Sequence, residues 1–146
     1  MSRTAAFIAL VETASREGVE SRRRYLKEHG PHEMGWSYAN ILEVEPLLQR
    51  QLKVKGFFRT YLYLPEPEKA VPFALKVTAL RTYAKRQLFQ DPVDGRMYLV
   101  HSRMTIQSIE QVHPPLVLGD FVSIDIRKPD TRYLELGFLF VVDPEV

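Results

Sequence analysis

The side chains that most often carry out catalysis form no recognised catalytic or metal-binding pattern in this sequence. His29 and His32 lie close together, but Gly30-Pro31 separates them, so one helical face cannot present both. The motifs HExxH, GxSxG and SxxK are absent, and the seven glycines form no phosphate-binding loop. The sequence contains no cysteine. We therefore expect no catalytic residue, no metal and no cofactor.

Basic residues that recur beside aromatic residues are the stronger chemical signal. A strand expected at 57–64 would place Arg59, Tyr61 and Tyr63 on one face and Phe58, Leu62 and Leu64 on the other. Aromatic faces can stack bases, and cations can neutralise phosphates. The same residues are also common in the core and rim of an ordinary sheet, so the pattern alone leaves both interpretations open.

A run of three arginines, Arg22 to Arg24, lies in a helix expected at 19–29. These side chains would cover much of the helix circumference. They could form a solvated surface, or they could follow a phosphate backbone.

Length and composition indicate one domain. The chain has 146 residues, of which 45% are hydrophobic and 26% are charged, the ordinary balance of a globular domain. The formal net charge of +2 permits an anionic partner without requiring one. No apolar run is long enough to span a membrane, and the lack of cysteine fits an intracellular, cytoplasmic protein. Because the chain ends just after the apolar run "FLFVV", we expect it to be one domain of a longer protein.

Hydrophobic periodicity predicts helices first and strands afterwards. Apolar spacing predicts a helix at 3–15, so residues 1–30 would form a helical extension packed on the rest of the domain. Residues 32–40 have no clear period and are expected to form a loop. A third helix at 41–53 requires Pro46 to lie in its first turn or to break it. Strands are expected near 57–64, 71–83, 97–109, 120–127 and 133–142. So many strands in a short chain favour an α+β fold with a small closed β-barrel of five to six strands and two or three flanking helices.

The order of features from residue 36 to residue 121 resembles the EVE domain, a member of the PUA-like superfamily that includes the YTH and ASCH domains. The matching features are Trp36 in a loop, Asn40 before a helix, Tyr63 near a strand end, the valine motif at 77–80, the turn Asp91-Pro92 and the segment 115–118. The chain departs from the family pattern at Lys55-Gly56-Phe57, where the family commonly has Gly-Asp, and at Leu64-Pro65, where it has polar residues.

The resemblance implies a pocket that receives a flipped and often modified base. Aromatic walls can offset the cost of taking a base out of its stack, and an asparagine amide can both donate to and accept from a base edge. On this basis the expected pocket residues are Trp36, Tyr38, Asn40, Tyr61 and Tyr63. Cations that would hold the nucleic-acid backbone are Arg22, Arg23, Arg24, Arg59, Arg81, Lys85, Arg86 and Arg103.

Similar domains lie at the N-terminus of McrB-like subunits in modification-dependent restriction systems. The resemblance therefore favours DNA with a methylated base over RNA, and it implies a fused or associated NTPase or nuclease. Two alternatives stay open at this point: an RNA-binding module like the YTH and ASCH domains, and a non-catalytic domain that binds an acidic protein.

Overall fold

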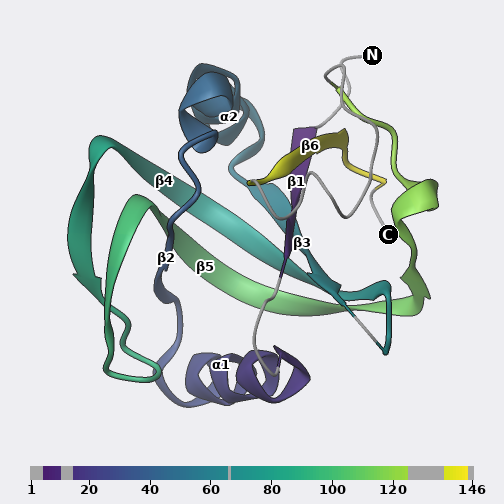
Figure 1. Ribbon diagram of the computed structural model, residues 1–146, viewed down its shortest axis with the longest axis horizontal. Helices are drawn as coiled ribbons and strands as arrows, with labels where there is room; N and C mark the ends of the chain where they lie inside the picture. Colours follow the sequence, from purple (N-terminus) through teal and green to yellow (C-terminus); the bar gives the residue numbers. More distant parts are fainter. Residues whose placement is uncertain (1–4, 11–14, 66, 125–136, 145–146) are drawn as a thin grey trace.

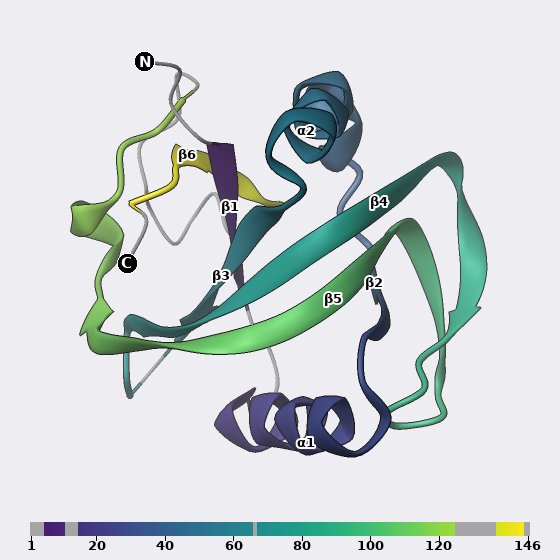
Figure 2. The same cartoon turned by 180° about the vertical axis from the view of Figure 1, so that it is seen from behind.

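The fold is α+β, with two α-helices and a six-stranded mixed sheet among the described residues (Figures 1 and 2). The computed structural model describes residues 5–10, 15–65, 67–124 and 137–144, without the side chains of 7–10 and 15. The elements in chain order are β1 (Ala5–Leu10), α1 (Ser15–His29), β2 (His32–Trp36), α2 (Ile41–Lys55), β3 (Phe58–Leu64), β4 (Ala70–Gln90), β5 (Met97–Leu116), the 3-10 helix η1 (Leu118–Asp120) and β6 (Leu139–Val142).

The sheet is open over the described residues, so the closed barrel expected from the sequence is not what these residues form. The strand order is β2-β5-β4-β3-β1-β6, which leaves β2 and β6 at the two edges. Strands β1 and β3 are parallel, and every other neighbouring pair is antiparallel. The long hairpin of β4 and β5 bends at register shifts, including one between Thr82 and Gln87. These bulges let the hairpin curl over the sheet without pairing one edge strand with the other.

The N-terminal part of the predicted helical extension is wrong. Residues Ala5–Leu10 form β1, which lies between β3 and β6 in the sheet, whereas residues 11–14 lie outside the described residues. A short continuous apolar run such as "AAFIAL" suits a strand buried inside a sheet as well as it suits a helix. The second predicted helix is confirmed as α1, which ends before Gly30 with a positive φ of 83°.

The region around the predicted third helix is partly as expected. Helix α2 is confirmed, and it ends at Gly56, whose N–H donates to the Leu52 carbonyl at 2.8 Å. Pro46 was expected in the first turn or at a break, but it lies in the second turn of an uninterrupted helix. The predicted loop at 32–40 is wrong in its first half, because His32–Trp36 pairs with β5 as an edge strand. This strand carries too few residues to show a period.

The central predicted strands are confirmed and the later ones only in part. The predictions at 57–64, 71–83 and 97–109 correspond to β3, β4 and β5, although β4 and β5 are several residues longer. In the described part of the prediction at 120–127, residues 118–120 form η1 and no regular strand follows, although Ser123 bridges to Val141 and the Ile124 N–H donates to the Phe140 carbonyl at 3.1 Å. Of the prediction at 133–142, residues 139–142 form β6 and residues 133–136 lie outside the described part of the chain.

The sheet has a hydrophobic core on each face. One core packs α1 and α2 against side chains such as Phe58, Leu62 and Phe73. The other lies on the opposite face and contains Tyr61 and Tyr63 beneath η1 and β6. Strand β3 is therefore buried on both sides, and the two sets of side chains that alternation separates belong to different cores. No helix among the described residues is long and apolar enough to cross a membrane.

Candidate functional site

A cavity of about 520 Å³ opens between α1, β2, the tip of the β4–β5 hairpin and the sheet. Its volume lies within the usual range of small-molecule sites. Leu62 and Leu75 contribute the sheet side of the cavity. The remaining lining residues are Gly18, Val19, Ser21, Arg22, Met34, Gly35, Trp36, Ser37, Tyr38, Asp91, Val93, Asp94, Tyr98, Leu99, Val100 and Ile109.

The hairpin can form a wall of this cavity because β2 presents a glycine to it. A Cβ atom on Gly35 would lie 2.5 Å from Cγ1 of Val100 and 3.2 Å from Cδ2 of Phe89. These distances are too short for any side chain, so the hairpin tip sits directly on the β2 backbone. Figures 1 and 2 show the hairpin curling from the sheet toward α1.

An ion pair fixes the hairpin tip to α1. Nη2 of Arg22 lies 2.5 Å from Oδ2 of Asp91, and the two side chains are only 12% and 8% exposed. The other carboxylate oxygen of Asp91 accepts the Val93 N–H at 2.8 Å. Arg22 also donates to Nε2 of His32 at 3.1 Å, while Nδ1 of His32 lies 3.2 Å from the Gly30 carbonyl. This geometry fits a neutral imidazole that donates from Nδ1 and accepts at Nε2.

The pKa values around this ion pair follow from burial and hydrogen bonding. Burial lowers the pKa of His32, and the nearby Arg22 cation lowers it further, against the Gly30 carbonyl, which raises it. For Asp94, burial acts to raise the pKa, but hydrogen bonds from the Tyr98 hydroxyl and the Arg96 N–H outweigh it and lower the pKa. The Asp94 carboxylate is therefore ionised at neutral pH, and both Asp91 and Asp94 already accept hydrogen bonds from the protein.

Trp36 and Tyr38 are the two predicted pocket residues that the structure places at the cavity. Their rings are stacked, with centroids 6.3 Å apart and an interplanar angle of 17°, and both contact the ring of Phe138 edge-on. Trp36 is 9% exposed and belongs to the core on this face. Its indole Nε1 is buried and has no hydrogen-bond partner among the described residues. A buried N–H normally has a partner, so this donor is an unsatisfied group within the core on this face in the described part of the chain.

Asn40 does not line the cavity, which corrects its predicted role. Its Nδ2 donates to the Phe138 carbonyl at 2.8 Å, and its Oδ1 accepts the Phe138 N–H at 3.1 Å. The amide thus pairs with the Phe138 backbone as a neighbouring strand would. It connects the start of α2 to the segment that leads into β6. A Cβ on Gly137 would lie 2.6 Å from Oδ1 of Asn40, so this contact also requires the glycine.

Replacing Asn40 with alanine is expected to lower the free energy of unfolding by about 1–3 kcal/mol, because the paired Phe138 backbone groups lose both partners. Chemical denaturation would measure the loss. Asn40→Asp is the matched variant, because it keeps the acceptor and loses the donor. Its free energy of unfolding is expected to lie between those of the wild type and Asn40→Ala. A stability of Asn40→Ala equal to the wild type would contradict the structural role.

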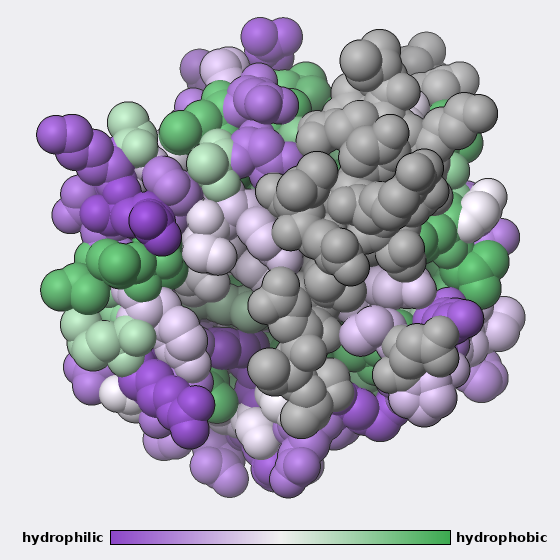
Figure 3. Space-filling view, in the orientation of Figure 1, coloured by the Kyte–Doolittle hydropathy of each residue, from purple (hydrophilic) through white to green (hydrophobic). Residues whose placement is uncertain are grey.

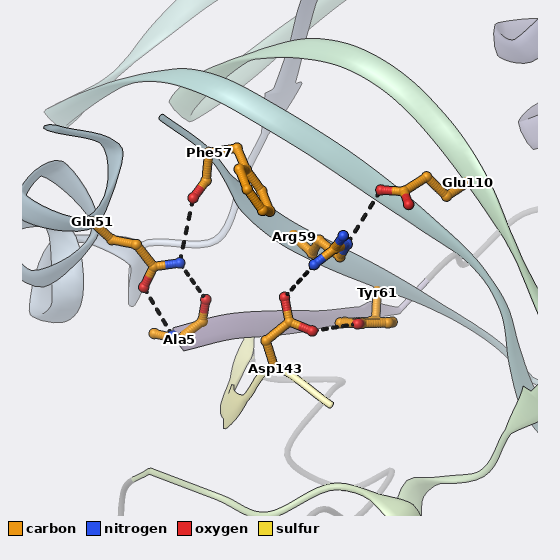
Figure 4. A network of polar contacts seen from close by, with 7 residues as sticks. All are labelled: Ala5, Gln51, Phe57, Arg59, Tyr61, Glu110 and Asp143. Carbon is orange, nitrogen blue, oxygen red and sulfur yellow. Dashed lines mark hydrogen bonds and ion pairs between the residues drawn. The ribbon is translucent and has the colours of Figure 1, made fainter. Parts of the chain in front are cut away.

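Tyr61 and Tyr63 are also absent from the cavity, because they lie in the core on the other face of the sheet. Figure 4 shows Tyr61 in a polar network, where its hydroxyl donates to Oδ1 of Asp143 at 2.5 Å. Arg59 lies 3.0 Å from the other oxygen of Asp143 and 3.2 Å from Glu110. In the same view Gln51 holds the N–H and carbonyl of Ala5 at 2.9 and 3.0 Å. This network ties β3 to the segment after β6.

Burial and the hydrogen bond to Asp143 both raise the pKa of Tyr61 well above its ordinary value. When pH rises above about 10, the unfolded chain loses this proton while the folded chain keeps it. The unfolded state then binds fewer protons, so the contribution of Tyr61 to stability is complete below this pH and is lost as pH rises through the alkaline range.

Tyr61→Phe is therefore expected to lower stability at neutral pH by about 1.5–3 kcal/mol and to flatten the alkaline loss of stability. Thermal unfolding from pH 8 to pH 11 would measure both effects. Tyr83→Phe is the control, because the Tyr83 hydroxyl makes no hydrogen bond in the described part of the chain. An alkaline slope that is unchanged in Tyr61→Phe would contradict this role.

The predicted backbone-binding cations divide into engaged and exposed groups. Arg22, Arg23 and Arg59 pair with carboxylates, and Arg103 lies over Phe89 with its Nη2 donating to the Leu88 carbonyl. The burial of Arg22 and Arg59 removes them from any phosphate contact. The exposed group is Arg24, Arg81, Lys85 and Arg86.

Several cavity residues had no signal that identified them as a site in the sequence. Asp91 and Asp94 belong to the hairpin turn and Tyr98 to the start of β5, and only the turn at Asp91-Pro92 was predicted. Gly18 falls between the helices predicted at 3–15 and 19–29, whereas the structure places it inside α1. The segment "QDPVDGRMY" contains more polar side chains than a turn requires. This excess is a signal that could have identified the hairpin tip as part of a site.

No protein-family model, no curated protein and no solved structure matches this chain. In the part of the chain that the structure describes, no group of three or more histidine, aspartate or glutamate side chains could hold a metal ion. The function of the cavity is therefore inferred from its lining residues and their geometry.

Proposed function

We propose that the chain is a cytoplasmic nucleic-acid-binding module that holds one base, taken out of its stack, in the cavity beside Trp36. The ligand that we favour is DNA with a methylated base. On this proposal the chain is a PUA-like, EVE-type specificity domain of a modification-dependent restriction system, and a partner domain or subunit supplies any NTPase or nuclease activity.

The observation that carries the proposal is the stacked pair of aromatic rings, Trp36 and Tyr38, in the wall of the cavity. The flat faces of a base suit these rings. Stacking on an aromatic side chain is worth about 1–3 kcal/mol per base, which is similar to the few kcal/mol that extrusion costs.

The charge distribution supports the same proposal. Residues 81–103, which include the hairpin tip, contain five basic and two acidic residues, so this segment carries a net charge of +3. Both acidic residues, Asp91 and Asp94, are held by donors from the protein. The wall of the cavity is therefore surrounded by cations that a phosphate backbone could contact.

A binding titration against matched oligonucleotides at two salt concentrations tests the proposal. The set contains plain and methylated duplex DNA, single-stranded DNA, and RNA with and without methylated adenine. We expect tightest binding to one methylated DNA and a steep loss of affinity with salt. Preference for RNA would support the RNA-binding alternative. No binding to any of them would overturn the proposal in favour of a protein-interaction domain.

A further inference from the structure

The outer face of the hairpin tip is apolar and exposed. Leu88 pairs with Leu99 and Gln90 pairs with Met97 across the hairpin, so these four side chains share one face. Leu88, Met97 and Leu99 are 62%, 55% and 49% exposed. Figure 3 shows hydrophobic side chains gathered at the side of the molecule where this hairpin lies. Large apolar side chains rarely gather on an exposed hairpin unless they contact something.

The opposite face of the same ribbon belongs to the cavity. Phe89 and Val100 are almost fully buried and pack on Gly35 of β2. One side of the ribbon thus closes the cavity, and the other side presents Leu88 and Met97 to the surroundings, whereas Leu99 is exposed and also lines the cavity. A ribbon with two such faces can act as a wedge between a group bound in the cavity and a group that contacts the outer face.

The charges beside the apolar face indicate an anionic partner. Lys85, Arg86 and Arg96 are exposed and make no ion pair in the described part of the chain. A second copy of this chain that paired through the same face would bring the two sets of cations together, which is unfavourable. A nucleic acid offers both phosphates for the cations and base faces for the apolar side chains.

We infer that the hairpin tip is a wedge, in which Leu88 and Met97 contact the base step that is exposed when the neighbouring base enters the cavity. The inference rests on the proposed function. Apolar side chains that insert at base steps compensate for lost stacking in other nucleic-acid complexes. The wedge is needed only where a stack must be opened, so it concerns duplex ligands more than single strands.

The test uses the double variant Leu88→Gln and Met97→Gln, because neither residue lines the cavity, with Val54→Gln as a control, since Val54 is 79% exposed on α2. Binding is measured to a duplex and to a single strand that contain the same methylated base. A 2-aminopurine next to that base reports unstacking. We expect the double variant to lose about tenfold in duplex affinity together with the 2-aminopurine signal, and to lose less than about threefold with the single strand.

Two results would overturn the wedge alone. The first is unchanged duplex affinity and unstacking in a double variant whose thermal unfolding matches the wild type. The second is altered self-association in sedimentation with intact duplex binding, which would make the face a contact between copies. If the wild type binds no nucleic acid, the proposed function fails and the wedge fails with it.

Discussion

Gly18→Trp is expected to abolish the preference for a modified base while leaving the fold intact. Gly18, Ser21 and Arg22 share one face of α1 and line the cavity, and a Cβ at Gly18 meets open space. A tryptophan at this position would occupy the volume that the base requires. Loss of base stacking should weaken binding of the preferred ligand roughly 10- to 100-fold.

Gly18→Ala is the matched control for this variant. Alanine leaves most of the cavity free and removes a helix glycine, so it should raise stability by about 0.5–1 kcal/mol with unchanged affinity. Fluorescence anisotropy and thermal unfolding measure the two quantities. If Gly18→Trp folds and binds the preferred oligonucleotide as tightly as the wild type, the base does not enter this cavity.

Arg22→Ala is expected to produce the largest loss of stability, about 3–5 kcal/mol. The substitution leaves the Asp91 carboxylate buried without its cation, and uncompensated buried charge is costly. It also removes the partner of the His32 ring and releases the hairpin tip from α1. We expect base preference to decline as well, because the released tip is a wall of the cavity.

Arg23→Ala separates this effect from the loss of a positive charge. Arg23 belongs to the same helix and pairs with Glu20, but both side chains are more than one-third exposed, so the change should be below about 1 kcal/mol. Denaturation of the two variants at one pH compares them directly. Equal stabilities for Arg22→Ala and Arg23→Ala would contradict the structural role of the Arg22–Asp91 pair.

The parts of the fold that the sequence predicted are those with strong local signals. Helix α2 is bounded by Gly56 and has apolar side chains at helical spacing, and β3 alternates clearly between two faces. Strand β1 was assigned to a helix because apolar residues at 3–15 fall at helical spacing, but a short continuous apolar run such as Ala5–Leu10 matches that spacing and a buried strand equally well. The register shifts that bend the hairpin depend on contacts between distant residues, so the local pattern could not show that the sheet stays open.

Only the part of the candidate site that is formed by residues close together in the sequence could be predicted. Trp36 and Tyr38 are close in the sequence and reach the cavity together. Alternation correctly separated Tyr61 from Leu62, but it could not tell which face of β3 the hairpin would cover. Asn40 carried no signal that its amide would bind the backbone of Phe138, because 98 residues separate them. The Arg22–Asp91 pair joins residues 69 positions apart and was missed for the same reason.

The fluorescence of Trp36 tests the central claim most directly, because it is the only tryptophan in the chain and lies in the cavity wall. We would titrate the protein with methylated and plain duplex DNA and follow tryptophan emission and anisotropy in the same samples. A base that stacks in the cavity is expected to quench Trp36 with the methylated ligand, at the concentrations where anisotropy reports binding. Binding without any change in Trp36 emission would place the nucleic acid elsewhere and contradict the account.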